Sequence, residues 1–458
     1  MTPDPQQEAP PGYRPAVALL DLGPDFWDPV QAADFPQTVL RYRNDRAAAE
    51  VGLDGLTGEE WLRRFGRFKP LPGTLPEPLA LRYHGHQFRS YNPDIGDGRG
   101  FTFAQMRDHD GRLMDLGTKG SGRTPYSRFG DGRLTLKGGV REILATEMLE
   151  ALNVPTSRSL SLIETGEALD RGDEPSPTRS AVLVRLSHGH IRIGTFQRLA
   201  YHQDEANMRR LVDYGLRELY GEEPGSEPAL RLLELVVERA ARLAARYMAA
   251  GFVHGVLNSD NINVTGESFD YGPWRFAPTW DVNFTAAYFD HAGLYGFGRQ
   301  PEAIHWDAMQ LAASLRLVAE SEPLIERLDA FGPRFQAHVG DALLWRMGLK
   351  PRSPDEDRVL VQTLERTLRD TGVELHRFFH DAFGRSVPVT YGEGWSAFRA
   401  LADAYEPRKE RGRFFEGEPC GMLIDEVEAI WAPIAERDDW DPLYAKVEQV
   451  RAMAEALA

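Results

Sequence analysis

The order of the secondary-structure signals along the 458-residue chain constrains its fold more than any other feature. Up to about residue 195, apolar residues gather in short segments typical of strands, with one helix among them. Beyond that point they recur at helical spacing over long segments. This change predicts an α+β fold with two lobes, a mixed α/β lobe followed by a mainly helical one. We expect residues 1–80 to form a leader and an extension, residues 81–194 the first lobe and residues 195–458 the second.

Three signals define the first lobe. Two alternating segments, 101–106 and 113–119, flank an Asp-Gly pair that favours a tight turn, so we expect a hairpin that ends at Lys119. Apolar residues at helical spacing predict a helix over 138–152, which carries Glu142. Segments 159–163 and 180–186 are further strand candidates.

The second lobe begins with a long predicted helix. Ser226 is the candidate N-cap, and Gly251 is a suitable C-terminal stop after Ala250. A polar loop follows over 254–261. We then expect a short hairpin of 262–264 with 268–269, which leaves Asp270 at its exit, and mainly helices beyond about Glu302.

Composition excludes several classes of protein. The formal net charge of −16 makes nucleic acid and anionic membranes poor partners for the surface as a whole. The only cysteine, Cys420, excludes an intrachain disulfide and a four-cysteine zinc site. We read no signal peptide and no membrane span, and therefore expect a cytoplasmic protein. Five prolines within residues 1–15 predict a flexible leader.

The order of these elements resembles that of protein kinases. In that arrangement Lys119 pairs with Glu142 and is held against nucleotide phosphates. Asn261 and Asp270 supply an amide oxygen and a carboxylate to Mg²⁺, and phosphate oxygens complete the shell. Taken singly, the first pair could be a solvated surface ion pair, and the second could be local turn residues.

One position departs from the kinase pattern. His254 and Asn261 keep the seven-residue spacing, but Val256 stands where a kinase has its catalytic aspartate. Valine accepts no proton, so either the site is inactive as a kinase or another carboxylate serves. Asp260 is the candidate, and its alternative role is that of a turn residue.

Glycine and arginine residues add a second departure. Gly96-Asp-Gly-Arg-Gly100 precedes the hairpin, and Gly130-Asp-Gly-Arg133 lies between Lys119 and Glu142. Glycines let the backbone approach phosphate closely, and arginines chelate it. With Arg185 and Arg192, these residues predict a basic cavity for a buried polyanion.

Together these motifs resemble the selenoprotein O family, pseudokinases that are similar to protein kinases in fold and act as protein adenylyltransferases. The resemblance covers roughly residues 80–310. Its motifs are Tyr83-His-Gly-His-Gln-Phe88, Gly96-Asp-Gly-Arg99, Lys119-Gly-Ser-Gly-Arg-Thr-Pro-Tyr-Ser-Arg128, Gly130-Asp-Gly-Arg133, Arg141-Glu142, Arg185 to Arg192, His254-Gly-Val-Leu-Asn-Ser-Asp-Asn261, Asp270-Tyr-Gly-Pro273 and Gln300-Pro301.

The resemblance implies that ATP binds in an inverted orientation and that AMP passes to a Ser, Thr or Tyr hydroxyl of a protein substrate, releasing pyrophosphate. It places the proton acceptor on Asp260 and the metal ligands on Asn261 and Asp270, with Glu142 supporting Lys119. The implied nucleotide contacts are Gly96, Gly98, Arg99, Lys119, Asp131, Gly132, Arg185 and Arg192. It also implies UMP transfer with Mn²⁺ as an alternative.

The sequence departs from this family after about residue 330, where an expected Asn-Pro segment and a C-terminal cysteine pair are missing. We therefore expect a divergent C-terminal region without an intramolecular redox switch. Two other functions stay open at this stage. One is a kinase that transfers the γ-phosphate, and the other is a nucleotide-binding scaffold with little catalysis.

Overall fold

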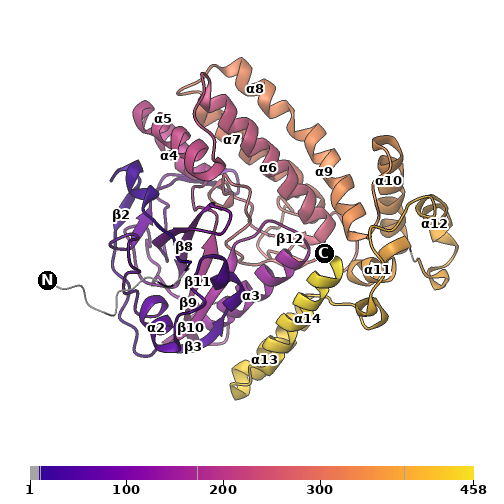
Figure 1. Cartoon of the computed structure of the whole chain (residues 1–458), viewed down its shortest axis with the longest axis horizontal. Helices are drawn as coiled ribbons and strands as arrows, with labels where there is room; N and C mark the ends of the chain where they lie inside the picture. The colour runs from indigo at the N-terminus through magenta and orange to yellow at the C-terminus, as the bar shows by residue number, and fades with distance from the viewer. Residues whose placement is uncertain (1–9, 11, 173, 386) are drawn as a thin grey trace.

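The computed structural model describes residues 10, 12–172, 174–385 and 387–458. Most of the predicted leader therefore lies outside the described residues. The described chain joins a strand-rich part, drawn in indigo and purple in Figure 1, to a helical part in pink, orange and yellow. The expected α+β class, mixed first and mainly helical afterwards, is confirmed.

A nine-stranded antiparallel sheet forms the strand-rich part. Its main path runs β2-β4-β7-β8-β11-β10-β3, with β1 added to β7 and β9 added to β11. Its strands are β1 (Pro15–Ala16), β2 (Trp27–Pro29), β3 (Val39–Arg43), β4 (Leu79–Leu81), β7 (Thr102–Arg107), β8 (Leu113–Lys119), β9 (Leu134–Thr135), β10 (Arg158–Leu169) and β11 (Thr178–Ser187). Two short ladders pair β5 (Gly85–Gln87) with β6 (Ser90–Asn92), and β12 (Phe252–Val253) with β13 (Arg275–Phe276).

The predicted hairpin is present as β7 and β8, which pair Met106 with Met114. Its turn is held by the side chain of Asp108, whose Oδ1 accepts the backbone N–H of Asp110 at 3.0 Å and of Arg112 at 2.9 Å. Across the next ladder Lys119 lies opposite Leu183 and Gly117 opposite Arg185. Because alternate residues of a strand share a face, Lys119 and Arg185 lie on the same face of the sheet.

The helix that carries Glu142 is α3 (Leu136–Ala151), two residues earlier at its start than predicted. Thr135 caps it, because its hydroxyl accepts the Gly138 N–H at 3.1 Å. A side chain at Gly139 would come within 2.3 Å of Leu162 of β10. Glycine therefore allows α3 to pack closely on the sheet.

The remaining helices form the second part. They are α4 (Ile193–Tyr201), α5 (Glu205–Tyr214), α6 (Pro228–Ala250), α7 (Gln300–Leu315), α8 (Ser321–Asp329), α9 (Phe331–Arg346), α10 (Pro354–Thr371), α11 (Leu375–Asp381), α12 (Ser396–Ala402), α13 (Ile424–Arg437) and α14 (Asp441–Leu457). Two short helices, α1 (Asp45–Glu50) and α2 (Gly58–Phe65), belong to the strand-rich part. No helix of the described ranges is both long and apolar enough to cross a membrane.

The predicted start of the long helix was wrong by one residue. Helix α6 begins at Pro228, and Glu227, not Ser226, occupies the N-cap position. Proline at the first helical position explains the difference, because its fixed φ and missing N–H suit a helix start. The predicted end is confirmed, since Gly251 adopts a left-handed conformation at φ 69°.

The predicted hairpin of 262–264 with 268–269 was also wrong. Asn263 bridges to Arg192, and Ser268 bridges to Thr156, so each segment pairs with a different part of the chain. The Ile193 N–H donates to the Ile262 carbonyl at 3.0 Å, and the Ser157 N–H donates to the Ser268 carbonyl at 2.9 Å. These long-range pairings join the two parts of the fold, and Asp270, which follows them, lies close to Lys119 and Arg185 of the sheet.

The last two helices, α13 and α14, return to the strand-rich part and lie beside α3 (Figure 1). Arg451 of α14 binds the buried carboxylate of Glu147 of α3 at 2.8 Å. Lys446 of the same helix binds Glu426 of α13 at 2.6 Å. The helix that carries Glu142 is therefore packed between the sheet and the C-terminal helices.

Candidate active site

A cavity of about 690 Å³ lies where β8 and β11 meet the loop segments 97–100, 126–133 and 256–273. Positive charge dominates its lining, because seven cationic side chains face three carboxylates. The cations are Arg99, Lys119, Arg128, Arg133, Arg171, Arg185 and Arg192, and the carboxylates are Asp97, Asp131 and Asp270. In a chain of net charge −16, such a concentration of positive charge indicates an anionic ligand.

Asp270 lies at the centre of these charges. Its Oδ1 lies 2.6 Å from Arg185 Nη1 and 3.5 Å from Lys119 Nζ. Its Oδ2 lies 3.2 Å from Arg192 Nη1. Burial alone would raise the pKa of this carboxyl, but the three cations outweigh it and hold the pKa well below its usual range.

Lys119 makes the predicted ion pair with Glu142. Both side chains are almost fully buried, with 5% and 2% exposed, so this is not a solvated surface pair. A buried pair fixes the ammonium group at the cavity wall, whereas an exposed lysine would sample many rotamers. Glu142 of helix α3 thus determines the position of the Lys119 ammonium group at the end of β8.

Arg192 connects the two parts of the fold. It occupies the N-cap position of α4 and donates to the Asp260 carbonyl at 3.0 Å. Its other nitrogen, Nη2, lies 3.1 Å from Asp97 Oδ1. The guanidinium also stacks 4.4 Å from the ring centroid of Tyr83. These contacts hold an almost completely buried cation in one orientation.

The polar loop after β12 is held by buried hydrogen bonds. The His254 N–H donates to Gln300 Oε1 at 3.0 Å, and Gln300 Nε2 donates to the Phe252 carbonyl at 2.8 Å. Asn261 donates from Nδ2 to the Val256 carbonyl at 3.1 Å, which leaves its amide oxygen available as a ligand. The His254 ring contacts the Phe269 carbonyl through Nε2 at 3.0 Å, so this side chain has a structural role here.

Asp260 lies behind the cavity wall, beside Asn261. Its side chain is buried, and its Oδ1 has no hydrogen-bond partner among the described residues. Burial raises the pKa of this carboxyl to about 6, with Arg192 opposing the shift. This carboxylate therefore keeps free acceptor capacity at Oδ1.

Two of the predicted glycines are required by close contacts. A Cβ at Gly96 would lie 2.4 Å from the ring of Tyr126, and one at Gly132 would lie 2.2 Å from the Gly122 carbonyl oxygen. Gly132 also has a left-handed φ of 71°. The neighbouring Asp131 carboxylate is held by Arg171 at 2.8 Å. The glycine-rich turns therefore fold over the cavity as tightly packed backbone.

The structure brings most predicted site residues to this one cavity. Gly98, Arg99, Lys119, Asp131, Gly132, Arg185, Arg192, Asn261 and Asp270 line it. Gly96, Glu142 and Asp260 lie immediately behind the lining, each next to a residue that does line it.

Sequence reasoning missed several lining residues, notably Tyr83, Asp97, Arg128 and Arg171. Tyr83, Asp97 and Arg128 stand within quoted motifs but received no role there. Arg171 follows β10 in a turn without any motif, so only the tertiary structure places it here.

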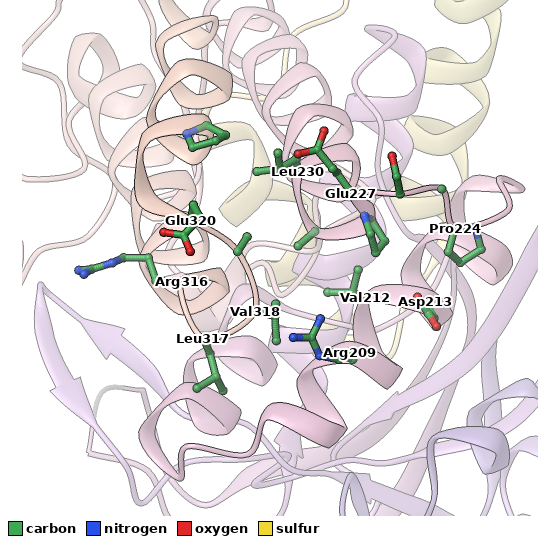
Figure 2. A pocket seen from close by; sticks show the side chains of 16 residues that line it. Arg209, Val212, Asp213, Pro224, Glu227, Leu230, Arg316, Leu317, Val318 and Glu320 are labelled. Carbon is green, nitrogen blue, oxygen red and sulfur yellow. The ribbon is translucent and has the colours of Figure 1, made fainter.

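A second cavity of about 700 Å³ differs in chemistry. It lies between α5, the start of α6 and the segment joining α7 to α8. Figure 2 shows Val212, Leu230 and Val318 among charged side chains of both signs. Its carboxylates outnumber its arginines, and Arg209 is already paired with Glu205. It has no surplus of positive charge and therefore suits an anionic ligand less well than the first cavity does.

Comparison with known proteins identifies the chain. Residues 12–388 match the family described as protein adenylyltransferase SelO. The chain belongs to the SelO family. A relative from Gloeobacter violaceus is 46% identical over 96% of this chain and 95% of its own length, and one from Synechocystis is 42% identical over 96% and 98%. Both are named protein nucleotidyltransferase YdiU.

Membership of the SelO family confirms the resemblance read from the motifs and the prediction of an enzyme, a nucleotidyltransferase. A solved structure of ROP2 from Toxoplasma gondii, described as a virulence factor with a protein-kinase fold and no enzymatic activity, is also similar. Its identity is 10% and its TM-score 0.25, over 72% of this chain and 82% of that one. This similarity says nothing about the activity of this chain.

Proposed function

We propose that this chain transfers AMP from ATP to the hydroxyl group of Ser, Thr or Tyr side chains in proteins. The observation that carries the proposal is the cavity in which Lys119, Arg185 and Arg192 surround Asp270. The acceptor oxygen forms a bond to the α-phosphorus while the bond to the β-phosphate breaks, and pyrophosphate leaves. Reactions of this kind depend mainly on positioning and charge stabilisation, which fixed cations supply.

An inverted ATP is part of the proposal. In this orientation the γ-phosphate is turned inward, and the α-phosphate is presented to the acceptor. Positive charge throughout the cavity is compatible with it, because Arg99, Arg128 and Arg171 on the loops extend the positive field beyond Lys119. A triphosphate lying in either direction would meet cations along its length. Val256 is consistent with the same pose, since a base at that position would serve γ-phosphate transfer.

Mg²⁺ or Mn²⁺ fits the donor set of the site. Asn261 offers an amide oxygen and Asp270 a carboxylate, both hard oxygen ligands. Within the described ranges no group of three or more His, Cys, Asp or Glu side chains could hold a metal, so nucleotide phosphates would have to complete the shell. When bound, the ion would offset the negative charge of the phosphates.

Asp260 is the proposed proton acceptor. With a pKa of about 6, its carboxyl is mostly ionised at neutral pH and remains basic enough to accept a proton from a hydroxyl. Its free Oδ1 supports this role, because a carboxylate that is fully hydrogen-bonded would be a weaker acceptor.

The deciding experiment compares ATP labelled at the α or the γ phosphorus, with Mg²⁺ or Mn²⁺ present, and follows label into protein. We expect label from the α position only, and we expect Asp270→Ala and Asp260→Asn to abolish it. The control is Asp403→Asn, an exposed carboxylate on a remote segment, which should label like the wild type. Parallel reactions with labelled UTP and Mn²⁺ measure UMP transfer as the alternative.

Label from the γ position only would identify a kinase and refute AMP transfer. Label from UTP with Mn²⁺, and none from ATP, would replace AMP by UMP as the transferred group. No label from any nucleotide, with ATP still bound, would favour a nucleotide-binding scaffold.

A further inference from the structure

A second group of arginines lies away from the nucleotide cavity, at the C-terminal ends of α3 and α6. Arg242 and Arg246 stand one turn apart on α6, so they share a face of that helix. Arg346 is the last residue of α9. Together with Asn153 and Trp345, the three arginines line a cavity of about 200 Å³.

Within the described residues, none of these three arginines forms an ion pair with a carboxylate. Glu238, one turn before Arg242, is bound to His338 at 2.7 Å and to Arg334 at 3.4 Å. Asp341 is exposed at the edge of the cavity and pairs with none of the three. The cavity therefore retains surplus positive charge in a chain that has 69 acidic residues.

Burial makes this charge costly. Arg346 is only 6% exposed, and burial lowers the pKa of its guanidinium to about 9. Burial, followed by repulsion from Arg242 and Arg239, lowers the pKa of Arg246 to about 10. Burial and Arg239 also lower the pKa of Arg242, and Glu238 offsets this only in part. An arginine in such a position is normally paired with an anion.

Helix capping explains only part of the cluster. Arg246 binds the carbonyl oxygen of Asn153 and, at 2.9 Å, its side-chain oxygen, and Arg346 binds the Ala249 carbonyl near the end of α6. Arg242 makes no such contact, and its buried Nε has no hydrogen-bond partner among the described residues. Capping therefore leaves Arg242 without a role.

We propose that the cavity lined by Arg242, Arg246 and Arg346 binds a small phosphate-containing anion, such as phosphate or pyrophosphate. Planar guanidinium groups bind phosphate oxygens through two parallel hydrogen bonds, and three of them would match the charge of phosphate or pyrophosphate. The volume suits one or two phosphate groups, because ligand pockets for whole organic molecules start at about 300 Å³. This site is separate from the nucleotide cavity and does not depend on the proposed transfer reaction.

The test measures binding of inorganic phosphate and of pyrophosphate to the full chain by calorimetry, at constant ionic strength set with chloride. It is run in the Lys119→Ala background, so that binding in the nucleotide cavity is weakened. We expect saturable binding of one anion per chain, and at least a tenfold loss of affinity in Arg242→Gln. Arg239→Gln is the matched control, because Arg239 lies on the same helix, is exposed and does not line the cavity.

A second measurement separates a ligand site from a structural one. In phosphate-free buffer Arg242→Met should melt at or above the wild-type temperature, because its guanidinium has no partner to lose. The same variant should show no stabilisation by added phosphate. The proposal is overturned if neither anion binds, if Arg242→Gln binds like Arg239→Gln, or if Arg242→Met melts lower than wild type and keeps the phosphate response.

Discussion

Asp307, in the middle of α7, offers a quantitative test of the buried electrostatics. Its side chain is fully buried, and neither carboxylate oxygen has a hydrogen-bond partner in the described part of the chain. Burial, reinforced by the negative charge of Asp260, raises the pKa of this carboxyl well above its ordinary value. Arg89 opposes the shift without cancelling it. The folded chain therefore holds this proton more tightly than the unfolded chain does.

The sign of the pH effect follows from that difference. A carboxyl whose pKa is higher in the folded state contributes its full stability below the unfolded pKa of about 3.9 and loses it as pH rises toward the folded pKa. Over that interval each pH unit lowers the free energy of unfolding by about 1.4 kcal/mol. Asp307→Asn removes this titration and keeps the size of the side chain. Between pH 5 and 6, its stability relative to wild type should rise, by up to about 1.4 kcal/mol.

Urea unfolding of both proteins at pH 5.0 and 6.0 measures this change, because titrations shared by the two proteins cancel in the difference. Glu322→Gln, which neutralises an exposed carboxylate on α8, should differ from wild type by the same amount at both pH values. If the stability of Asp307→Asn relative to wild type did not change with pH, or fell as pH rose, the assignment of a buried, proton-retaining carboxyl would be refuted.

Three further substitutions test the nucleotide cavity. Lys119→Ala should weaken ATP binding in calorimetry and abolish label transfer, and unchanged affinity would count against the Lys119 site. Arg192→Ala should weaken ATP more than AMP, because the inverted pose brings the γ-phosphate inward, whereas equal losses would speak against that pose. Gly132→Ala should lower the melting temperature and ATP affinity, since its strained φ alone costs about 1–3 kcal/mol. Gly172→Ala, with nothing within 4 Å of the added carbon, is its control, and equal melting of the two variants would contradict the predicted strain.

Local signals predicted the parts of the fold that local chemistry determines. The Asp-Gly turn identified the β7 and β8 hairpin and placed Lys119 at its end, and Gly251 identified the end of α6. Segment 262–269 was misread because its partners, Arg192 and Thr156, lie about 70 and 110 residues earlier. The residue pattern of this segment suits a hairpin, and it does not show that each half pairs with a distant part of the chain.

The site residues also fall into two groups, those that local motifs identify and those that only the tertiary structure places. Motif spacing named Asn261 and Asp270, and the structure gathers both at one cavity. Arg171 enters from a turn after β10 that has no motif, and Asp307 is one acidic residue in an ordinary helical pattern. Their roles depend on burial and on neighbours distant in the chain, which a single sequence does not display.

The return of α14 to α3 also determines when during synthesis the site can be completed. Glu147 and Arg451 are 304 residues apart, so at roughly 5–20 residues per second the ribosome makes α14 about 15 to 60 s after α3. Throughout that interval the helix that carries Glu142 lacks one of its two packing partners. In a nascent chain, α3 therefore gains its contacts with α13 and α14 only after residues 424–457 have been made, long after the residues that line the nucleotide cavity.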